Sequence, residues 1–240
     1  MNNKLFLIFA LLFALSSGAY GQIPTSKNLA KFDHRVMHFG FLLGINSANF
    51  VLERQPETFS GSDTLLVLEP KTATGFNLGI ISSLHLNEYF SLRFTPNLAF
   101  ASRTLNYKFQ TYDGEKNYSK IIESTLINLP LGIKYKSVRV NNFSAYVLVG
   151  GAYTIDLASN VGNDNNANNA SDVIVAIKRN DFLAEIAFGT DFYLEYFKFG
   201  LEFKMSYGLK NLIDHNNQQF TDPIDKLKSK MFLLSLTFEG

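Results

Sequence analysis

Apolar and polar residues alternate along most of this chain, and the alternation is clearest over residues 182–212. In the first half of that stretch, Phe182 and Phe188 fall on one parity, whereas Glu185 and Asp191 fall on the other. A period of two places successive side chains on opposite faces of a β-strand. The stretch therefore predicts a strand with one apolar face and one polar face.

The second half of the same stretch predicts a partner strand. Only Glu195 and Tyr196 are left for the turn, so the two strands are expected to form a hairpin. Strands of water-soluble proteins are typically about five or six residues long, whereas arms of about ten or more residues with one apolar face suit the hydrocarbon layer of a membrane. The apolar parity of the second strand consists of Phe197, Phe199, Leu201, Phe203, Met205, Tyr207 and Leu209.

The same alternation recurs along the chain and predicts eight strands. They are expected over residues 38–49, 75–86, 90–101, 123–136, 143–156, 182–194, 197–209 and 232–238. Their connections are alternately long and short, with long loops over 51–71, 106–120, the Asn-rich 160–172 and 211–228. In outer-membrane barrels the extracellular loops are long, the periplasmic turns are short and the strand count is even. The prediction is an all-β fold, an eight-stranded antiparallel up-and-down transmembrane β-barrel with short periplasmic turns and long extracellular loops.

Pro96 lies inside the third predicted strand, on its apolar parity. A proline has no backbone N–H and cannot donate to a neighbouring strand. We therefore expect a bulge or a broken ladder hydrogen bond at this position.

The polar parity indicates what would line the barrel. A water-soluble lipocalin-like barrel would carry its large apolar face inside, but here the inner positions hold Gly, Ser, Asn, Ala and charged residues, too small to build an apolar core. The large apolar face is therefore expected to meet lipid. Aromatic girdles are expected at Tyr89, Phe90, Phe143, Tyr196 and Phe197 near the short turns, and at Phe50, Phe109 and Tyr153 toward the long loops.

Six charged residues on the inner parity predict how the lumen is filled. An eight-stranded barrel is just wide enough for side chains to fill it, and buried charges are usually paired because an unpaired one costs several kcal/mol. The six therefore predict a structural ion-pair network that closes the lumen, rather than a catalytic or conducting site. They are the cations Arg93, Lys134 and Lys204 and the anions Glu185, Asp191 and Glu202.

The beginning of the chain has the features of a secretory signal peptide. A basic residue, Lys4, precedes an apolar run over 5–15, and small residues follow at Ala19 and Gly21. Cleavage is expected between Gly21 and Gln22, because an apolar run of about eleven residues is too short to span a bilayer. The predicted organisation is a signal peptide at 1–21, a periplasmic extension at 22–37 and a barrel at 38–240, located in the outer membrane.

Composition excludes several classes of function. The chain has no cysteine, so thiol chemistry, disulfides and a lipid-modified cysteine are ruled out. Its formal net charge of +1 gives no sign of a nucleic-acid partner. The 23 Phe and 11 Tyr suit a bilayer and its interfaces better than a small water-soluble core. Outer-membrane lipid is therefore an expected partner.

The histidines and carboxylates do not predict a catalytic or metal site. His34 and His38 have a spacing of four, which would suit a metal on a helix, but the local pattern is not helical. Asp214 and His215 in a long loop suggest a hydrolase or acyltransferase at the external rim, but no nucleophile is placed beside them. The Asn-rich loop lacks a regular spacing of calcium ligands. We expect no enzymatic activity, no cofactor, no metal and no small-molecule substrate.

Four segments resemble the PorT family of outer-membrane proteins from Bacteroidetes. NEYFSLRF-x-P, KS-x-R-x-NN and KMSYGLKNL are the more specific matches, whereas LPL-x-IKYK is shared with many barrels of that phylum. The resemblance covers essentially the whole mature chain. The four segments are residues 38–46, 75–100, 127–153 and 196–212.

The resemblance implies a component of the type IX secretion system, needed to export proteins with a C-terminal sorting domain and, in gliding species, to display motility adhesins. It implies no catalytic residues. Because a barrel this narrow cannot pass folded cargo, we expect an accessory role, through contacts with other secretion-system proteins, in the assembly, stabilisation or gating of a larger translocon. The alternative is a small closed barrel for envelope integrity or adhesion without a secretion role.

Overall fold

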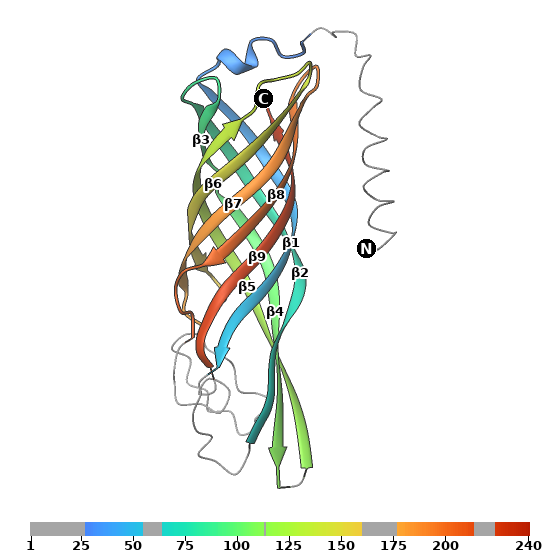
Figure 1. Ribbon diagram of the computed structural model, residues 1–240, viewed down its shortest axis with the longest axis vertical. Helices are drawn as coiled ribbons and strands as arrows, with labels where there is room; N and C mark the ends of the chain where they lie inside the picture. The colour runs from blue at the N-terminus through green and yellow to red at the C-terminus, as the bar shows by residue number, and fades with distance from the viewer. Residues whose placement is uncertain (1–26, 55–63, 113, 160–176, 214–223) are drawn as a thin grey trace, which may run out of the picture.

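A computed structural model describes residues 27–54, 64–112, 114–159, 177–213 and 224–240 of the protein (Figure 1). The predicted signal peptide, the Asn-rich loop and the pair Asp214 and His215 lie outside these residues. No helix in the described ranges is long and apolar enough to cross a membrane.

The described chain forms one closed antiparallel sheet. Strands that follow one another along the sequence pair with each other, except that β3 and β4 each pair with β2 and β5, and the last strand pairs with the first, which closes the barrel. The elements are η1 (Phe32–His34), β1 (Met37–Arg54), β2 (Thr64–His85), β3 (Phe90–Phe94), β4 (Asn97–Thr111), β5 (Gly114–Lys136), β6 (Phe143–Asp156), β7 (Asn180–Tyr193), β8 (Lys198–Gly208) and β9 (Ile224–Glu239). This is the predicted eight-stranded up-and-down barrel, because β3 and β4 together occupy one position between β2 and β5.

The break between β3 and β4 confirms the expectation at Pro96. Thr95 and Pro96 belong to neither strand. Both residues still form hydrogen bonds with the neighbouring strands. The Thr95 N–H donates to the carbonyl of Pro130 in β5, and the Ile80 N–H of β2 donates to the carbonyl of Pro96. A missing proline donor thus interrupts the ladder without opening the wall.

Each barrel strand alternates between lipid-facing and lumen-facing residues as the sequence predicts. On β7 and β8, Phe188 and Phe203 are exposed and lie opposite each other, whereas Glu185 and Glu202 are buried in the lumen. Asp191 faces Gly200, so the short turn sets the register that the sequence indicated. Closure of the sheet leaves no open edge in the barrel wall, as a membrane requires.

Most of the described residues of two predicted long loops, 51–71 and 106–120, are strand, so the prediction was wrong for those residues. β2 already begins at Thr64, and β4 and β5 continue to a tight turn beside Tyr112. These parts of β2, β4 and β5 project beyond the barrel as a three-stranded sheet at the end opposite η1 (Figure 1). We call residues 64–72, 103–112 and 114–122 the external extension.

These strand segments were predicted as loops because the outer face of the sheet passes from lipid into water. Within the barrel wall the outward residues Leu98 and Phe100 of β4 are apolar and exposed, whereas in the external extension the apolar residues Leu105 and Tyr107 point inward and are buried. The apolar parity reverses because the outer face leaves lipid and meets water. A search for one continuous apolar face therefore ends at the membrane boundary and assigns the rest to a loop.

The last strand is also longer than predicted. The sequence placed a loop over 211–228 and a strand over 232–238, but β9 begins at Ile224. The reason is the same, because Ile224 and Leu227 are apolar residues buried on the inside rather than exposed to lipid.

The aromatic girdle was predicted correctly at the end with short turns, and at the opposite end for Tyr153, which lies on the outer face beside Phe182. Tyr89, Phe90 and Tyr196 are exposed at the end with short turns. Phe50 and Phe109, assigned to the opposite girdle, are 3% and 1% exposed and point inward, so the assignment of these two residues was wrong.

Candidate functional site in the barrel lumen

Arg93 of β3 is the centre of the charged lumen. Its guanidinium is fully buried and donates to Glu202 of β8 at 3.0 Å and to Glu239 of β9 at 3.1 Å. The same Glu202 carboxylate accepts a hydrogen bond from the Tyr146 hydroxyl at 2.8 Å. One arginine thereby connects strands from opposite walls of the barrel.

Lys134 and Lys198 extend this arrangement toward the short turns. Lys134 of β5 lies 2.7 Å from Asp191 of β7, and its ammonium sits 3.6 Å from the centre of the Tyr146 ring. Lys198 of β8 lies 2.8 Å from Glu239 and 3.8 Å from Asp191. Each carboxylate is thus shared by more than one cation.

Lys204 extends the charged arrangement away from the short turns. Its ammonium lies 3.5 Å from Glu185 and 3.6 Å from Glu202, and Ser206 donates to Glu185 at 2.9 Å. The six residues singled out from the sequence are therefore all inside and in contact with one another or with shared partners. We call the full set the charge network: Arg93, Lys134, Lys198 and Lys204 with Glu185, Asp191, Glu202 and Glu239.

Three members of this site were missed from the sequence. Lys198 and Glu239 complete a balance of four cations and four carboxylates, and Tyr146 supplies the neutral hydroxyl. Lys198 could have been found, because it shares the parity of Glu202 and Lys204. Glu239 likewise continues the parity of Ser235 and Thr237 beyond the segment predicted as strand.

A belt of amides lies next to the charge network. Asn46 donates to Asn77 at 2.6 Å, and Asn77 and Asn128 both donate to the side-chain oxygen of Asn97, at 3.1 and 3.0 Å. Thr154 donates to Asn128 at 2.8 Å. These bonds connect the neighbouring strands β1, β2, β4, β5 and β6 around the inner wall, so most amide groups on this side pair with one another.

The end of the lumen toward the external extension is closed by apolar residues. This contradicts the expectation that inner residues are too small to build an apolar core. Ile177 pairs with Ile213 in an isolated bridge, which brings two connecting segments over the barrel end. We call the cluster the apolar plug: Phe50, Leu68, Leu105, Tyr107, Phe109, Ile177, Leu212, Ile213, Ile224 and Leu227.

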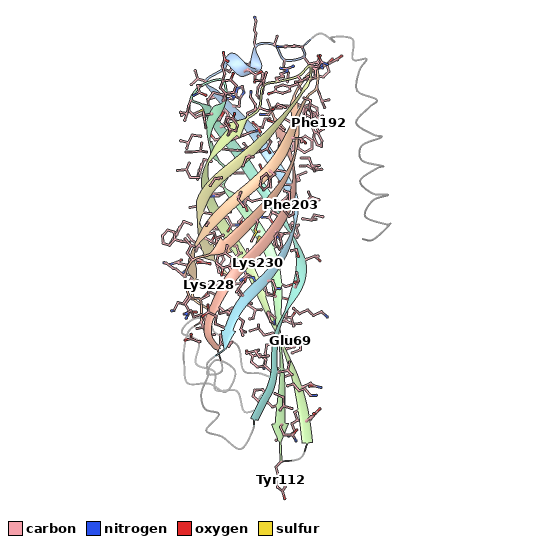
Figure 2. The ribbon with its side chains drawn as sticks, in the orientation of Figure 1. Glu69, Tyr112, Phe192, Phe203, Lys228 and Lys230 are labelled. Atoms are coloured by element: carbon pink, nitrogen blue, oxygen red, sulfur yellow. The ribbon has the colours of Figure 1, made fainter. Side chains whose placement is uncertain are left out.

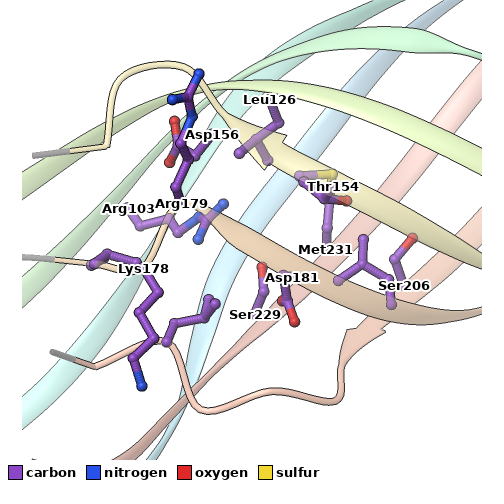
Figure 3. Close-up of a pocket in the computed structure, with 13 residues that line it drawn as sticks. Arg103, Leu126, Thr154, Asp156, Lys178, Arg179, Asp181, Ser206, Ser229 and Met231 are labelled. Atoms are coloured by element: carbon purple, nitrogen blue, oxygen red, sulfur yellow. The ribbon is translucent and has the colours of Figure 1, made fainter. Parts of the chain in front are cut away.

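A small pocket lies between the apolar plug and the polar lumen (Figure 3). Buried Arg103 and Asp181 line it, and the Arg103 guanidinium lies 4.6 Å from the centre of the Phe50 ring. Its volume is about 20 Å³, enough for a single water molecule, which needs roughly 10–15 Å³. The pocket therefore has no room for an organic substrate.

The opposite end is covered by residues 27–36, which we call the cap. Phe32 stacks on His38 at 3.7 Å, and His38 meets His85 edge-on at 4.7 Å. Asp33 binds Lys136 at 2.6 Å and lies 3.6 Å from Arg139. These contacts hold the described part of the predicted periplasmic extension across the barrel mouth.

Asp33 is the titratable residue that fastens the cap. Burial alone would raise the pKa of its carboxyl group, but the hydrogen bond and charge of Lys136, with smaller contributions from Tyr193 and Arg139, lower the pKa below its ordinary value. The carboxylate is therefore charged at neutral pH. Within the described residues, no cluster of three or more His, Asp or Glu side chains could hold a metal ion.

The profile of a protein family described as "Outer membrane protein beta-barrel domain" matches residues 22–214. The chain belongs to this outer-membrane β-barrel family. Similar solved structures include OprG from Pseudomonas aeruginosa, at 11% identity over 85% of this chain and 92% of that chain with a TM-score of 0.42. They also include Neisserial surface protein A, at 12% identity, 83% and 95% coverage and a TM-score of 0.43, and Ail of Yersinia pestis, at 10% identity, 86% and 100% coverage and a TM-score of 0.37. A comparison with curated proteins gave no match.

Membership of this family fixes how the barrel is oriented in the outer membrane. The exposed apolar belt faces lipid, the short turns lie on the periplasmic side, and the external extension projects from the cell. In this orientation the cap closes the periplasmic mouth, the charge network fills the middle, and the apolar plug closes the external end.

Proposed function

We propose that this outer-membrane barrel is a non-enzymatic accessory component of the type IX secretion system and acts through contacts rather than as a conduit. The resemblance of four segments to the PorT family supports the choice of secretion system. The observation that carries the accessory role is the closed lumen, in which Arg93 bridges two carboxylates from the far wall at 3.0 and 3.1 Å.

The physical argument concerns width and filling. An eight-stranded barrel has an interior that side chains can fill, and the charge network, the amide belt and the apolar plug fill it here. Passage of a folded protein would require breaking paired buried charges, each at a cost of several kcal/mol. Any contribution to export therefore has to come from surfaces that other proteins can reach, namely the cap side and the external extension.

The test is deletion of the gene, with secretion measured for cargo that carries a C-terminal sorting domain. The proposal expects cargo to accumulate inside the cell and, in a gliding host, motility adhesins to be lost from the surface. Re-expression of the intact chain should restore both, and other outer-membrane proteins should keep their normal levels. Normal secretion in the deletion strain would refute the secretion role.

A second candidate is an adhesion or envelope barrel, and the external extension favours it. A three-stranded sheet whose tip residue, Tyr112, is 99% exposed reaches away from the membrane and could contact another surface. Figure 2 shows Tyr112 at the far end of the molecule. Under this alternative, replacing residues 106–120 with a short turn would alter surface binding, and deletion of the whole gene would leave cargo secretion unchanged.

The absence of enzymatic activity and the removal of a signal peptide are part of the same proposal. Replacement of His215 should leave the lipid and peptide profile of the envelope unchanged, whereas a changed profile would indicate a rim enzyme. Sequencing of the mature N-terminus should begin at Gln22. Crosslinking from the cap should identify the partner protein on the periplasmic side.

A further inference from the structure

Three lysines lie on one sector of the outer wall, at the external edge of the apolar belt. On β9 the outward residues Phe232, Leu234 and Leu236 face lipid, and the same parity continues with Lys230 and Lys228. Figure 2 shows Lys230 and Lys228 following Phe203 along the wall toward the external extension. Lys210, just beyond the end of β8, is the third.

Each ammonium group lies over an aromatic ring of the wall. Lys230 lies 5.1 Å from the centre of the Phe232 ring, and Lys228 lies 5.8 Å from the Tyr207 ring. Lys210 lies 4.5 Å from the ring of Phe182, which faces lipid. Cation–aromatic contacts of this kind keep the charges beside the apolar belt, at the height where lipid chains meet headgroups.

The three lysines make no ion pair with the described residues, although the Glu53 carboxylate acts on Lys228, and the Asp181 carboxylate on Lys210, from beyond ion-pair distance. Neighbouring Lys226 is paired with Glu53 at 2.7 Å and lies 3.8 Å from Asp225. Lys210, Lys228 and Lys230, by contrast, have no carboxylate within 4 Å in the described ranges. The cluster is also local, because the register continues from Phe182 to Tyr153 of β6 and then to Leu129 of β5, neither of which is charged.

We propose that Lys210, Lys228 and Lys230 bind the phosphate groups of lipid A, the glycolipid of the outer leaflet. The position selects this lipid, because the three lysines lie at the extracellular end of the wall. Phosphate supplies the ion-pair partner that the three lysines lack among the described residues, and the adjacent outward residues Phe232 and Phe182 supply an apolar surface for acyl chains. This inference is independent of the proposed secretion role.

The first experiment uses the unmodified protein. Purified barrel in mild detergent is mixed with lipid A, with dephosphorylated lipid A or with phosphatidylglycerol, and retained lipid is counted by native mass spectrometry. Retention of lipid A alone supports the proposal, and weakening of that retention by salt is expected for exposed charges. Equal retention of dephosphorylated lipid A, or of phosphatidylglycerol, would overturn it.

The second experiment changes the lysines. The triple variant Lys210→Gln, Lys228→Gln, Lys230→Gln should bind lipid A about a hundredfold more weakly, because each lysine near an anionic surface contributes roughly fivefold. The matched control Lys31→Gln, Lys71→Gln, Lys108→Gln removes the same charge elsewhere and should bind normally. The triple Lys→Arg variant should also bind normally. Unchanged binding in the Gln triple variant, with heat-modifiable gel mobility intact, would overturn the proposal.

Discussion

The two halves of the lumen are closed by opposite chemistry. On the periplasmic side eight charged groups neutralise one another in the charge network, with Arg93 bound to carboxylates of two strands. On the external side the apolar plug fills the same cross-section with aliphatic and aromatic side chains, among them Leu105 and Phe109. The charge network requires that each charge has an opposite charge beside it, whereas the apolar plug requires only that its side chains fill the available volume.

This difference predicts different responses to substitution. Ion pairs link strands that are distant around the barrel, so the loss of one charge leaves its partners buried with fewer opposite charges. The apolar plug packs connecting segments onto the barrel end, so a missing side chain leaves a cavity that its neighbours can partly fill. The charge network should therefore control the stability of the whole barrel, whereas the apolar plug should control the external end.

The largest effect is expected for Arg93→Ala. It leaves Glu202 and Glu239 with fewer partners and should lower the free energy of unfolding by about 3–5 kcal/mol, measured by urea unfolding and heat-modifiable gel mobility. Lys226→Ala removes an exposed cation and should leave both unchanged. Adding Glu239→Gln to Arg93→Ala should cost less than the sum of the two single changes. Unchanged stability of Arg93→Ala would show that the network does not hold the barrel.

A smaller and more local effect is expected for Leu105→Ala. The cavity in the apolar plug should cost about 2–4 kcal/mol. Hydrogen exchange should increase mainly around Ile177 and Leu212 and should change little near Arg93. The matched control is Leu98→Ala on the same strand, whose side chain faces lipid. Uniform acceleration of exchange throughout the barrel would contradict the separation of the two halves.

Tyr146→Phe tests a single neutral member of the polar half. The change removes the hydroxyl that donates to Glu202 at 2.8 Å but keeps the ring beneath Lys134. A hydrogen bond to a charged group contributes about 1.5–3 kcal/mol, and chemical unfolding should show a loss in this range. Tyr135→Phe, on the lipid face, serves as the control and should show no loss.

The smallest effect is expected at the cap. The pKa of Asp33 is lowered in the folded protein, so its attachment to Lys136 is complete at neutral pH and is lost as the pH falls from about 4 through the lowered pKa. Because the chain has no native cysteine, a spin label on Lys31→Cys reports the mobility of the cap alone. Mobility should rise only in acid, and Asp33→Asn should make it high already at neutral pH. A label indifferent to both changes would show that Asp33 does not fasten the cap.

The barrel strands were predictable because their outer face meets the same solvent, lipid, along its whole length. Wherever one face meets lipid, as at Phe188 and Phe203, the period of two is unbroken, and even the interruption at Pro96 follows from a missing donor. Six of the eight network charges also followed from parity. The external extension did not, because Leu105 and Tyr107 lie on the opposite parity once the outer face meets water.

The cap and the apolar plug were missed for another reason. Phe32 contacts Tyr193 and Asp33 binds Lys136, and each partner is more than a hundred positions away along the sequence. No local periodicity indicates such contacts. Ile177 and Ile213 reach the lumen from connecting segments rather than from strands. Contacts of this kind depend on how the closed barrel brings distant segments together.

The central claim is that the lumen is sealed in both halves, and ion conductance tests it most directly. The purified protein is reconstituted in a planar lipid bilayer and current is recorded under an applied voltage. The account predicts no steady conductance, because the charge network and the apolar plug occupy the cross-section. A stable open-channel current from the unmodified protein would contradict it.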